Sequence, residues 1–155
     1  MSQPTSERSV DAVRAAARLA KVAGSALVDA ELTLPQYRVL VFLSVRERPA
    51  AHVAALLGVT PPTVTSVVDG LVARGLVSRT TDPADRRRVV LRITDDGAAA
   101  MAGGDAVVGA GLDRLLARLD ESQAETALVG LELLNRAMEL ALEERFGPDS
   151  PTLAP

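Results

Sequence analysis

The sequence contains no cysteine and no tryptophan, and only one histidine, one tyrosine and two phenylalanines among its 155 residues. Without cysteine, the chain has no disulfides, thiolate zinc sites, iron–sulfur clusters or thiol redox switches. A single histidine, His52, excludes a metal site built from several histidines and leaves few residues for acid–base chemistry. The sequence also lacks a glycine-rich phosphate loop and a nucleophile paired with a base. We therefore expect neither an enzyme nor a protein that holds a metal or a cofactor.

Long apolar segments are also missing. No run approaches the roughly 20 uncharged apolar residues that a membrane-spanning helix needs, and residues 1–7 lack the basic and apolar regions of a signal peptide. With 48% hydrophobic and 24% charged residues, the composition is typical of a globular chain. We expect a cytoplasmic protein without a membrane partner, built as one domain or as one small domain with appended helices.

The net charge of −3 conceals an uneven distribution of charged residues along the chain. Residues 1–49 carry a net charge of +2, residues 50–93 carry +3 and residues 94–155 carry −8. Three of the six arginines in the middle segment are consecutive, at positions 86–88. This arrangement indicates a basic surface for nucleic acid in the middle of the chain, followed by an acidic part that would repel it.

Two short helices joined by a tight turn are predicted in the middle segment. An apolar helix over residues 51–57 ends at Gly58, where helices favour a left-handed residue. The next helix has Thr60 as its N-cap and Pro61 at its first position, and it stops at Gly75. A helix, a turn that contains glycine and a second, capped helix form the helix-turn-helix layout.

After the second helix the apolar residues alternate with a period of two. Residues 76–80 and 89–93 are short runs rich in β-formers, and the segment between them contains Asp82-Pro83 and the three arginines. This pattern predicts a β-hairpin with arginines at its tip. A helix-turn-helix followed directly by such a hairpin is a winged helix, so we expect a mainly α fold with a small β-hairpin wing.

Long helices are predicted on both sides of the winged helix. The first covers residues 10–29, with Ser9 as N-cap, and the next starts at Leu34 behind Thr33. Thr94 caps a glycine-rich helix over residues 95–118, which we expect to be weak and bent near Gly103-Gly104 because glycine lowers helix stability. Asp120 and Gln123 predict a capping box at the start of the last helix. One face of that helix is apolar: Leu128, Leu131, Leu134, Met138 and Leu142, widened by Leu133 and Leu140.

The second helix of the predicted helix-turn-helix has two contrasting faces. At 100° per residue, Val64, Val67, Val68 and Leu71 form a stripe that we expect to be buried. The opposite face carries Pro62, Thr63, Thr65, Ser66, Asp69 and Ala73, whose small side chains suit the major groove of DNA. Any amphipathic surface helix also places serine and threonine outside, and a charged loop can simply be solvated. Both alternatives stay open on residue pattern alone.

Several linked motifs resemble the multiple-antibiotic-resistance regulators, the MarR family. Residues 57–65, Leu-Gly-Val-Thr-Pro-Pro-Thr-Val-Thr, resemble that family's Leu-Gly-Val-Ser-x-x-Thr-Val-Thr. Further motifs follow in the family's order: Val68-Asp69-x-Leu71, Arg74-Gly75-Leu76-Val77, Asp82-Pro83-x-Asp85-Arg86-Arg87 and Val89-x-Leu91-x-Ile93-Thr94-x-x-Gly97. The close match spans residues 33–97. It implies a winged-helix transcriptional regulator, with repression expected.

The resemblance also implies a homodimer that binds a pseudo-palindromic stretch of double-stranded DNA. The expected division is an N-terminal dimerisation helix (1–32), a winged helix-turn-helix (33–94), C-terminal dimerisation helices (95–146) and a disordered tail (147–155). By matching positions, Arg87 would reach a minor groove and Asp85 would support the wing, with Asp69 and Arg74 on the DNA-facing side. Spacing alone leaves Asp69 a choice between an arginine of the wing and a cytosine amine. The expected DNA-binding residues are Thr60, Pro62, Thr63, Thr65, Ser66, Asp69, Arg74, Asp85, Arg86, Arg87 and Arg88.

Two departures from the family pattern leave the recognition helix with fewer positive charges. Relatives often carry a cation after Thr-Val-Thr and after the aspartate, where this chain has Ser66 and Gly70. We therefore expect the wing to supply more of the salt-dependent affinity. Many relatives also bind a small aromatic or phenolic acid, and the candidate contacts here are Arg18, Lys21, Tyr37 and Arg38, because they fall on the helices that border the binding cleft in relatives. Tyr37 is equally suited to the core, with a hydrogen-bonded hydroxyl.

One alternative is kept beside the regulator. A winged helix can act as a module for protein interaction or dimerisation without binding specific DNA. The arginines at the tip of the wing argue against this alternative, and a DNA-binding titration would decide between the two.

Overall fold

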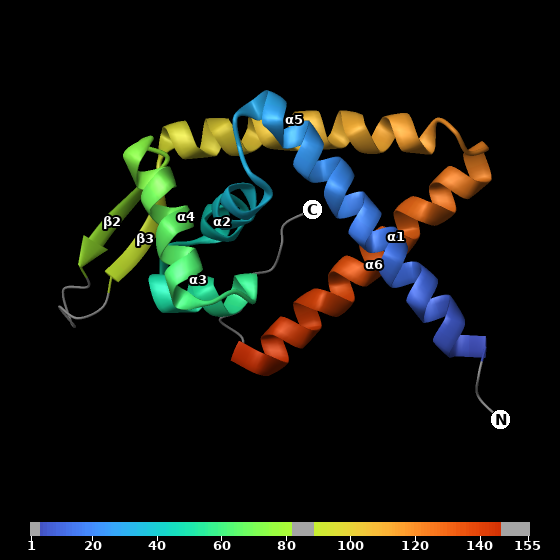
Figure 1. Ribbon diagram of the computed structural model, residues 1–155, viewed down its shortest axis with the longest axis horizontal. Coiled ribbons are helices and arrows are strands. Elements are labelled where there is room, and N and C mark those ends of the chain that lie inside the picture. Colours follow the sequence, from blue (N-terminus) through green and yellow to red (C-terminus); the bar gives the residue numbers. More distant parts are fainter. Residues whose placement is uncertain (1–3, 82–88, 147–155) are drawn as a thin grey trace.

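The computed structural model describes residues 4–81 and 89–146, and Figure 1 shows a small winged-helix body beside three long helices. The fold is mostly helical with a small three-stranded antiparallel sheet, which confirms the predicted fold class. The elements in chain order are α1 (Pro4–Ala26), η1 (Leu27–Ala30, a 3-10 helix), α2 (Leu34–Val45), β1 (Arg48–Pro49), α3 (Ala50–Leu57), α4 (Pro61–Ala73), β2 (Val77–Thr81), β3 (Val89–Ile93), α5 (Asp95–Leu116) and α6 (Glu121–Phe146).

The first helix differs from its prediction at both ends. It starts at Pro4, so Ser9 lies inside the helix and is not its N-cap. Proline is favoured in the first turn, because its missing N–H has no partner there in any case. At the other end the α-helix stops at Ala26, and the 3-10 helix η1 leads to Glu31 in a left-handed conformation, with φ 54°. The chain therefore turns toward α2 through a defined joint.

The predicted N-caps of α2, α5 and α6 are confirmed. Thr33 accepts a hydrogen bond from the Gln36 amide, and the Gln36 side chain accepts one from Thr33 in return. Thr94 accepts from Gly97 at the start of α5. Asp120 and Gln123 form the predicted capping box in front of α6. These caps rest on residues at most three positions apart, which is why sequence spacing reveals them.

The helix-turn-helix consists of α3 and α4. Gly58 and Gly75 end these helices with φ of 65° and 72°, conformations that suit glycine because it has no Cβ. The core lies between α2, α3, α4 and the sheet. Its fully buried side chains include Leu27, Val39, Leu40, Leu43, Val53, Val68, Leu71 and Leu91.

The sheet contains one strand more than predicted. Its order is β1-β3-β2, and both neighbouring pairs are antiparallel. β2 and β3 form the predicted hairpin, with Val77 opposite Ile93 and Thr81 opposite Val89. The added strand is only two residues long and includes a proline, so it carries no periodicity; its pairing with β3 forms only in the tertiary structure. The tip of the hairpin lies outside the described residues.

The glycine-rich helix α5 is continuous through Gly103-Gly104, and Figure 1 shows it running straight across the molecule. The predicted bend is therefore wrong. The reason is that Gly97, Gly104 and Gly111 are buried against other elements. A Cβ on Gly97 would lie 2.0 Å from the Leu76 carbonyl oxygen, and one on Gly104 would lie 2.8 Å from the Tyr37 ring. Packing against the winged helix supports a helix that its composition would weaken.

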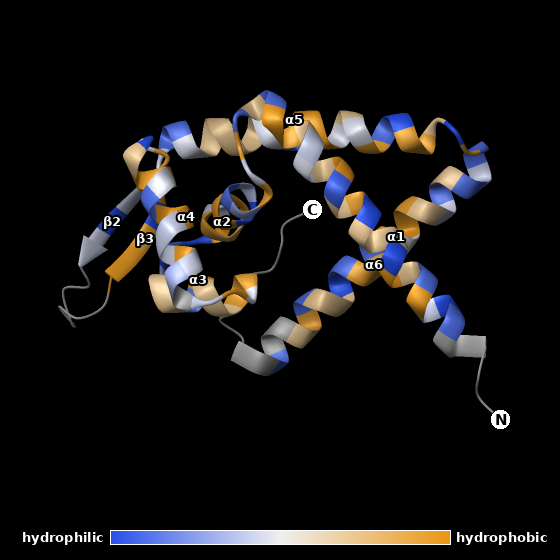
Figure 2. Ribbon diagram, in the orientation of Figure 1, coloured by the Kyte–Doolittle hydropathy of each residue, from blue (hydrophilic) through white to orange (hydrophobic). Residues whose placement is uncertain are grey.

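The apolar face of α6 is exposed in the single chain. Leu134 is 63% exposed and Met138 is 56% exposed, and Leu131, Leu133 and Leu140 are also open to solvent. Figure 2 shows hydrophobic residues recurring along this helix. In the described part of the chain no single helix is long and apolar enough to cross a membrane, and α3 and α4 reach that content only as a pair bent by 114°.

Candidate nucleic-acid interface

The helix α4 presents its polar face outward, as predicted from its pattern. Val64, Val68 and Leu71 are at most 3% exposed and anchor the helix to the core. Val67 is half-buried at the edge of this stripe. The opposite face is exposed and consists of Pro62, Thr63, Thr65, Ser66, Asp69 and Ala73. The hydroxyl groups on this face can meet base edges or phosphate oxygens without large movements of the helix.

The N-terminus of α4 differs in detail from its prediction. Thr60 occupies the N-cap position and is followed by proline at the first helical positions. Its side chain, however, makes no capping hydrogen bond to the backbone. The Thr60 and Thr63 hydroxyl oxygens instead lie 2.9 Å apart in a hydrogen bond. Both hydroxyls sit at the positive end of the helix dipole, where an anion is stabilised.

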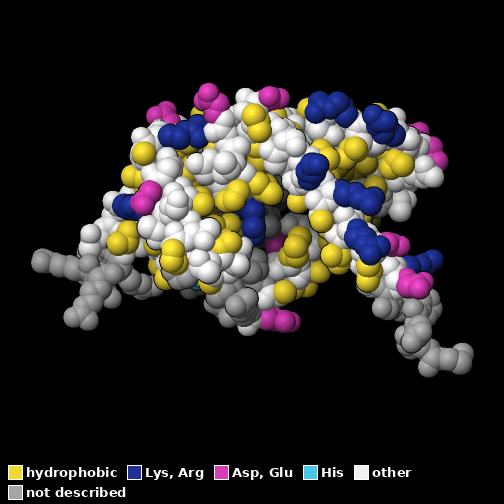
Figure 3. Space-filling view, in the orientation of Figure 1, with side chains coloured by type: hydrophobic (Ala, Val, Ile, Leu, Met, Phe, Trp, Pro, Cys, Tyr) yellow, Lys and Arg dark blue, Asp and Glu magenta, His cyan; other side chains and the backbone are white. Residues whose placement is uncertain are grey.

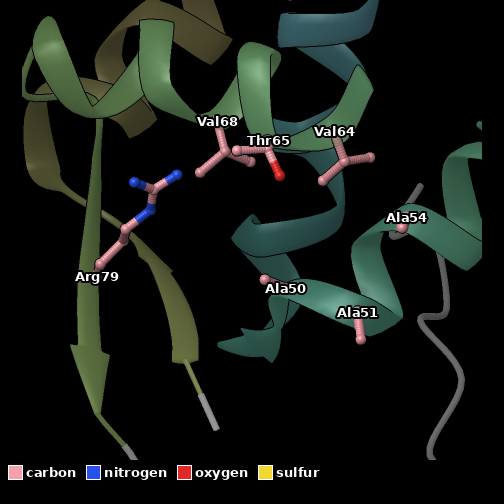
Figure 4. Close-up of a pocket in the computed structure, with 7 residues that line it drawn as sticks. All are labelled: Ala50, Ala51, Ala54, Val64, Thr65, Val68 and Arg79. Carbon is pink, nitrogen blue, oxygen red and sulfur yellow. The ribbon is translucent and has the colours of Figure 1, made fainter. Parts of the chain in front are cut away.

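An ion pair connects the recognition helix to the wing. The Arg79 guanidinium on β2 lies 2.5 Å from the Asp69 carboxylate on α4, measured from Nη2 to Oδ1. Figure 4 shows Arg79 extending from the strand toward α4. Of the two partners considered from the sequence, the structure therefore places Asp69 against an arginine of the wing, but one of strand β2 and not of the tip.

A hollow of about 280 Å³ lies between α3, α4 and β2. Figure 4 shows Thr65 and Val68 pointing from α4 into it, with alanines of α3 on the opposite side. Its lining consists of Ala50, Ala51, Ala54, Val64, Thr65, Val68 and Arg79. The small residues of α3 leave the exposed face of α4 unobstructed on this side.

The wing is also connected to the segment that precedes the helix-turn-helix. Arg92 on β3 donates to the Glu47 carboxylate through Nε, at 2.9 Å, and through Nη2, at 2.5 Å. Beside it, Arg48 of β1 is 1% exposed, and its Nε donates to the Phe42 carbonyl oxygen at 3.4 Å. These contacts hold the base of the hairpin. The predicted wing residues Asp85, Arg86, Arg87 and Arg88 lie outside the described residues.

Arg74 lies at the C-terminal end of α4 and has a partner within the protein. Its Nη1 donates a hydrogen bond to the Glu31 carbonyl oxygen at 2.6 Å. Glu31 is the left-handed residue between η1 and α2, 43 positions away in the sequence. The structure thus joins the end of the recognition helix to the end of the first long helix.

The four predicted effector residues lie on two helices, Arg18 and Lys21 on α1 and Tyr37 and Arg38 on α2. Lys21 lines a hollow of about 350 Å³ between α1, η1 and α5, together with Val22, Ser25, Ala26, Asp29 and Arg114. Arg18 and Arg38 are exposed outside its lining. Figure 3 shows lysine and arginine side chains gathered over α1 and the far end of α5. The hollow therefore lies within a basic surface of the long helices.

Tyr37 takes the core role that the sequence left open for it. Its hydroxyl donates to the Asp105 carboxylate, and its ring packs against Gly104. Burial, the hydrogen bond to Asp105 and the negative charge of that carboxylate together raise the pKa of Tyr37 well above its usual range. Tyr37 therefore connects α2 to α5. Among the residues that the structure describes, no group of three His, Asp or Glu side chains is placed to hold a metal ion.

Comparison with known proteins identifies the family. Residues 30–88 match the sequence model of the MarR family. A MarR-family transcriptional regulator from Rhodococcus sp. RHA1 is 26% identical, with a TM-score of 0.70 over 86% of this chain and 96% of the other. The repressor CouR, solved on a 23-mer DNA duplex, is 30% identical, with a TM-score of 0.68 over 80% of this chain and 89% of CouR. The chain belongs to the MarR family.

Two further findings extend this picture of a MarR-family chain. The HTH-type transcriptional regulator YfiV of Bacillus subtilis, itself uncharacterised, is 28% identical over 115 residues, which cover 74% of this chain and 72% of YfiV. CouR of Rhodococcus jostii RHA1 has also been solved with p-coumaroyl-CoA bound. That structure is 28% identical, with a TM-score of 0.62 over 79% of this chain and 87% of CouR. The MarR family comprises transcriptional regulators and not enzymes, and this chain carries its DNA-binding winged helix.

Several residues of this MarR-family winged helix escape prediction from the sequence. Arg79 and Arg92 look like ordinary strand cations, and Arg48 lies in a strand without a pattern. Their partners are 10, 45 and 6 positions away, at spacings that no local rule connects. The one available signal is Asp69, an acid on an otherwise neutral polar face, which can pair with a cation that folding brings near.

Proposed function

We propose that this MarR-family chain is a homodimeric transcriptional repressor that binds a pseudo-palindromic operator and is released by a small anionic effector. The observation that carries the DNA-binding part is the exposed hydroxyl face of α4 beside the wing. Thr63, Thr65 and Ser66 project from a helix whose other face is buried. In this arrangement α4 enters the major groove, and Arg87 at the tip of the wing reaches an adjacent minor groove, with Arg86 and Arg88 on phosphates.

Dimer formation is supported by the exposed apolar face of α6. Leu131, Leu134 and Met138 follow one another at three- and four-residue steps on one side of this helix. Contiguous apolar surface of this kind is stable in water when a partner covers it. A second copy that offers the same face forms a two-fold interface, and a two-fold dimer reads two half-sites about 10 base pairs apart.

The effector is proposed to bind in the hollow beside Lys21. Lys21 and Arg114 contribute positive charge from α1 and α5, which exceeds the negative charge of Asp29 in the same lining, and the Ser25 hydroxyl adds a hydrogen-bonding group. These groups suit a carboxylate or phosphate attached to an apolar body. CouR, the relative solved with p-coumaroyl-CoA, offers one example of an anionic aromatic ligand in this family. Release follows if the ligand prefers a dimer whose recognition helices no longer match the half-site spacing.

The proposal is tested by selecting genomic DNA fragments with the purified protein and titrating the enriched duplexes over a salt series. We expect protection of two related half-sites and an affinity that falls steeply with salt. A dimeric, folded protein that binds no duplex at low salt would support the alternative module for protein interaction. Protection of a single half-site would contradict the dimeric reading.

A further inference from the structure

The turn that follows α4 is held by both long helices that flank the winged helix. Gly75 and Leu76 close this turn through hydrogen bonds back to Val72 and Leu71, each at 2.9 Å. From the α5 side, the Thr94 hydroxyl donates to the Gly75 carbonyl oxygen at 2.7 Å. The Thr94 amide donates to the Leu76 carbonyl oxygen at 3.1 Å. The start of α5 is therefore fixed to the end of the recognition helix.

From the α1 side, the same region is held by Arg74. Its guanidinium donates to the Glu31 carbonyl oxygen at 2.6 Å. Glu31 is not a flexible acceptor, because its amide donates to Val28 at 3.0 Å and the next amide, of Leu32, donates to Leu27 at 3.0 Å. Leu27 and Leu32 are at most 3% exposed and anchor this joint in the core.

The left-handed conformation of Glu31 makes this contact informative. Residues other than glycine are disfavoured at φ 54°, so the surrounding contacts must hold Glu31 in this conformation. Arg74 supplies a charge-assisted hydrogen bond to the carbonyl group that this conformation presents. One turn earlier on α4, a Cβ on Gly70 would lie 3.3 Å from the side-chain nitrogen Nε2 of Gln36, so α4 also contacts a side chain at the start of α2.

We propose that Arg74 is a positioning residue, which fixes the direction of the recognition helix relative to α1 by holding the Glu31 carbonyl group. This inference rests on the proposed function, because the direction of α4 in each protomer sets the separation of the two recognition helices. It also links regulation to structure: Ala26 and Asp29 of the Lys21 hollow belong to the segment that ends at Glu31. The rival role for Arg74 is direct contact with a DNA phosphate.

The two roles are separated by Arg74→Met, which removes the guanidinium and keeps the apolar stem. Arg118→Met, an exposed arginine just beyond α5, is the matched control. Hydrogen exchange of residues 27–33 needs neither DNA nor a dimer. We expect Arg74→Met to speed exchange of the Glu31 and Leu32 amides roughly threefold to tenfold, because the joint opens more often, and Arg118→Met to leave it unchanged.

Binding to the selected operator supplies the second measurement. We expect Arg74→Met to keep the salt slope, which is the slope of log affinity against log salt concentration. We expect its preference for the natural half-site spacing, over spacers changed by one base pair, to fall several-fold. A phosphate contact instead predicts a slope smaller by about 2 per dimer, since each released contact contributes roughly 0.9. A smaller salt slope would overturn the inference, and so would unchanged hydrogen exchange of the Glu31 and Leu32 amides in Arg74→Met. Faster exchange without any loss of the preference for the natural spacing would overturn it as well. If the unaltered protein binds no duplex, the proposed function fails, and exchange still decides whether Arg74 holds the joint.

Discussion

Arg79 of β2 and Asp69 of α4 face each other across 2.5 Å, so the one acid on the exposed face of the recognition helix is engaged with the wing. Both side chains remain partly exposed, at 38% for Arg79 and 53% for Asp69. Exposed pairs of this kind contribute little to stability, because water and salt screen them. This pair connects α4 to the hairpin beside the face that we propose meets the DNA.

The ion pair predicts the behaviour of Asp69→Asn. We expect weaker operator binding with an unchanged base preference, because Arg79 loses its partner and the wing shifts relative to α4. Arg79→Met has the same effect, and the double variant is no worse than either single one, as coupled residues show in a mutant cycle. The measurement is affinity across an operator library, with the remote Asp113→Asn as control. A change of base preference at one position would show that Asp69 reads a cytosine instead.

The arginine tip of the wing yields a second prediction. Arg87→Ala is expected to weaken operator binding by about 1–3 kcal/mol if the side chain makes a specific groove contact. The loss should shrink at high salt, because part of it comes from counterion release. Fluorescence anisotropy over a salt series measures both effects, with Arg118→Ala as control. Equal affinity at every salt concentration would remove the wing from the mechanism.

A third prediction concerns the apolar face of α6. Leu134→Asp places a charge in the proposed dimer interface, and burial of one leucine is worth about 1.5–3 kcal/mol. We expect the dissociation constant of the dimer to rise roughly tenfold or more. Light scattering over a dilution series gives the mass, and Glu132→Gln, at an exposed polar position of the same helix, is the control. A monomeric unaltered protein at micromolar concentration contradicts the dimer.

A fourth prediction uses two glycines of α5. A Cβ on Gly97 meets the Leu76 carbonyl oxygen at 2.0 Å and Ile93 at 2.8 Å, whereas one on Gly103 meets nothing within 4 Å. Gly97→Ala should lower the free energy of unfolding by at least about 1–3 kcal/mol, because the backbone must move apart. Gly103→Ala should raise it by up to about 1 kcal/mol through helix propensity. Urea unfolding of both variants checks the contrast, and equal stabilities would refute the close approach of α5.

The raised pKa of Tyr37 gives a fifth prediction. Because the folded-state pKa lies above the unfolded value of 10.0, the stabilisation is complete below pH 10 and is lost as the pH rises further. Tyr37→Phe should cost about 0.5–1.5 kcal/mol at neutral pH and should remove this alkaline loss. Urea unfolding at about pH 8 and pH 11 measures it.

The single tyrosine makes the same prediction directly observable. Tyr37 is the only tyrosine of the chain, so tyrosinate absorbance reports this one hydroxyl without overlap. In the folded protein the absorbance should rise only above the range of a free tyrosine, and in urea it should rise near the ordinary value. An ordinary titration in the folded state would mean that Tyr37 is neither buried nor in contact with Asp105 as the structure places it.

What the sequence could predict follows from how far apart the interacting residues lie. The caps at Thr33, Thr94 and Asp120 depend on neighbours three positions away, and these predictions are confirmed. The buried and exposed faces of α4 follow from helical geometry in the same way. Local spacing was therefore sufficient for the order of the helices, the hairpin and the polar face, but not for the two ends of α1 or for a cap at Thr60.

The remaining features depend on contacts between distant segments. β1 has no pattern of its own and exists because β3 pairs with it. The straight course of α5 could not be predicted, because glycine's low propensity is offset by packing against Tyr37 and Leu76. The bond from Arg74 to Glu31 joins residues 43 positions apart through a backbone carbonyl group, which leaves no trace in side-chain chemistry.

Because α5 is unbroken, a small tilt at one end of this helix would become a larger displacement at its other end. Only Thr94 separates its first residue from the wing strand β3, and the helix continues for 22 residues to Leu116. At 1.5 Å per residue this is a stiff rod of about 33 Å. A tilt of roughly 5° about its far end would therefore displace the base of the wing by about 3 Å, which is enough to break contacts in a DNA groove. A small wedge between α1 and the distal part of α5 would be magnified mechanically at the DNA.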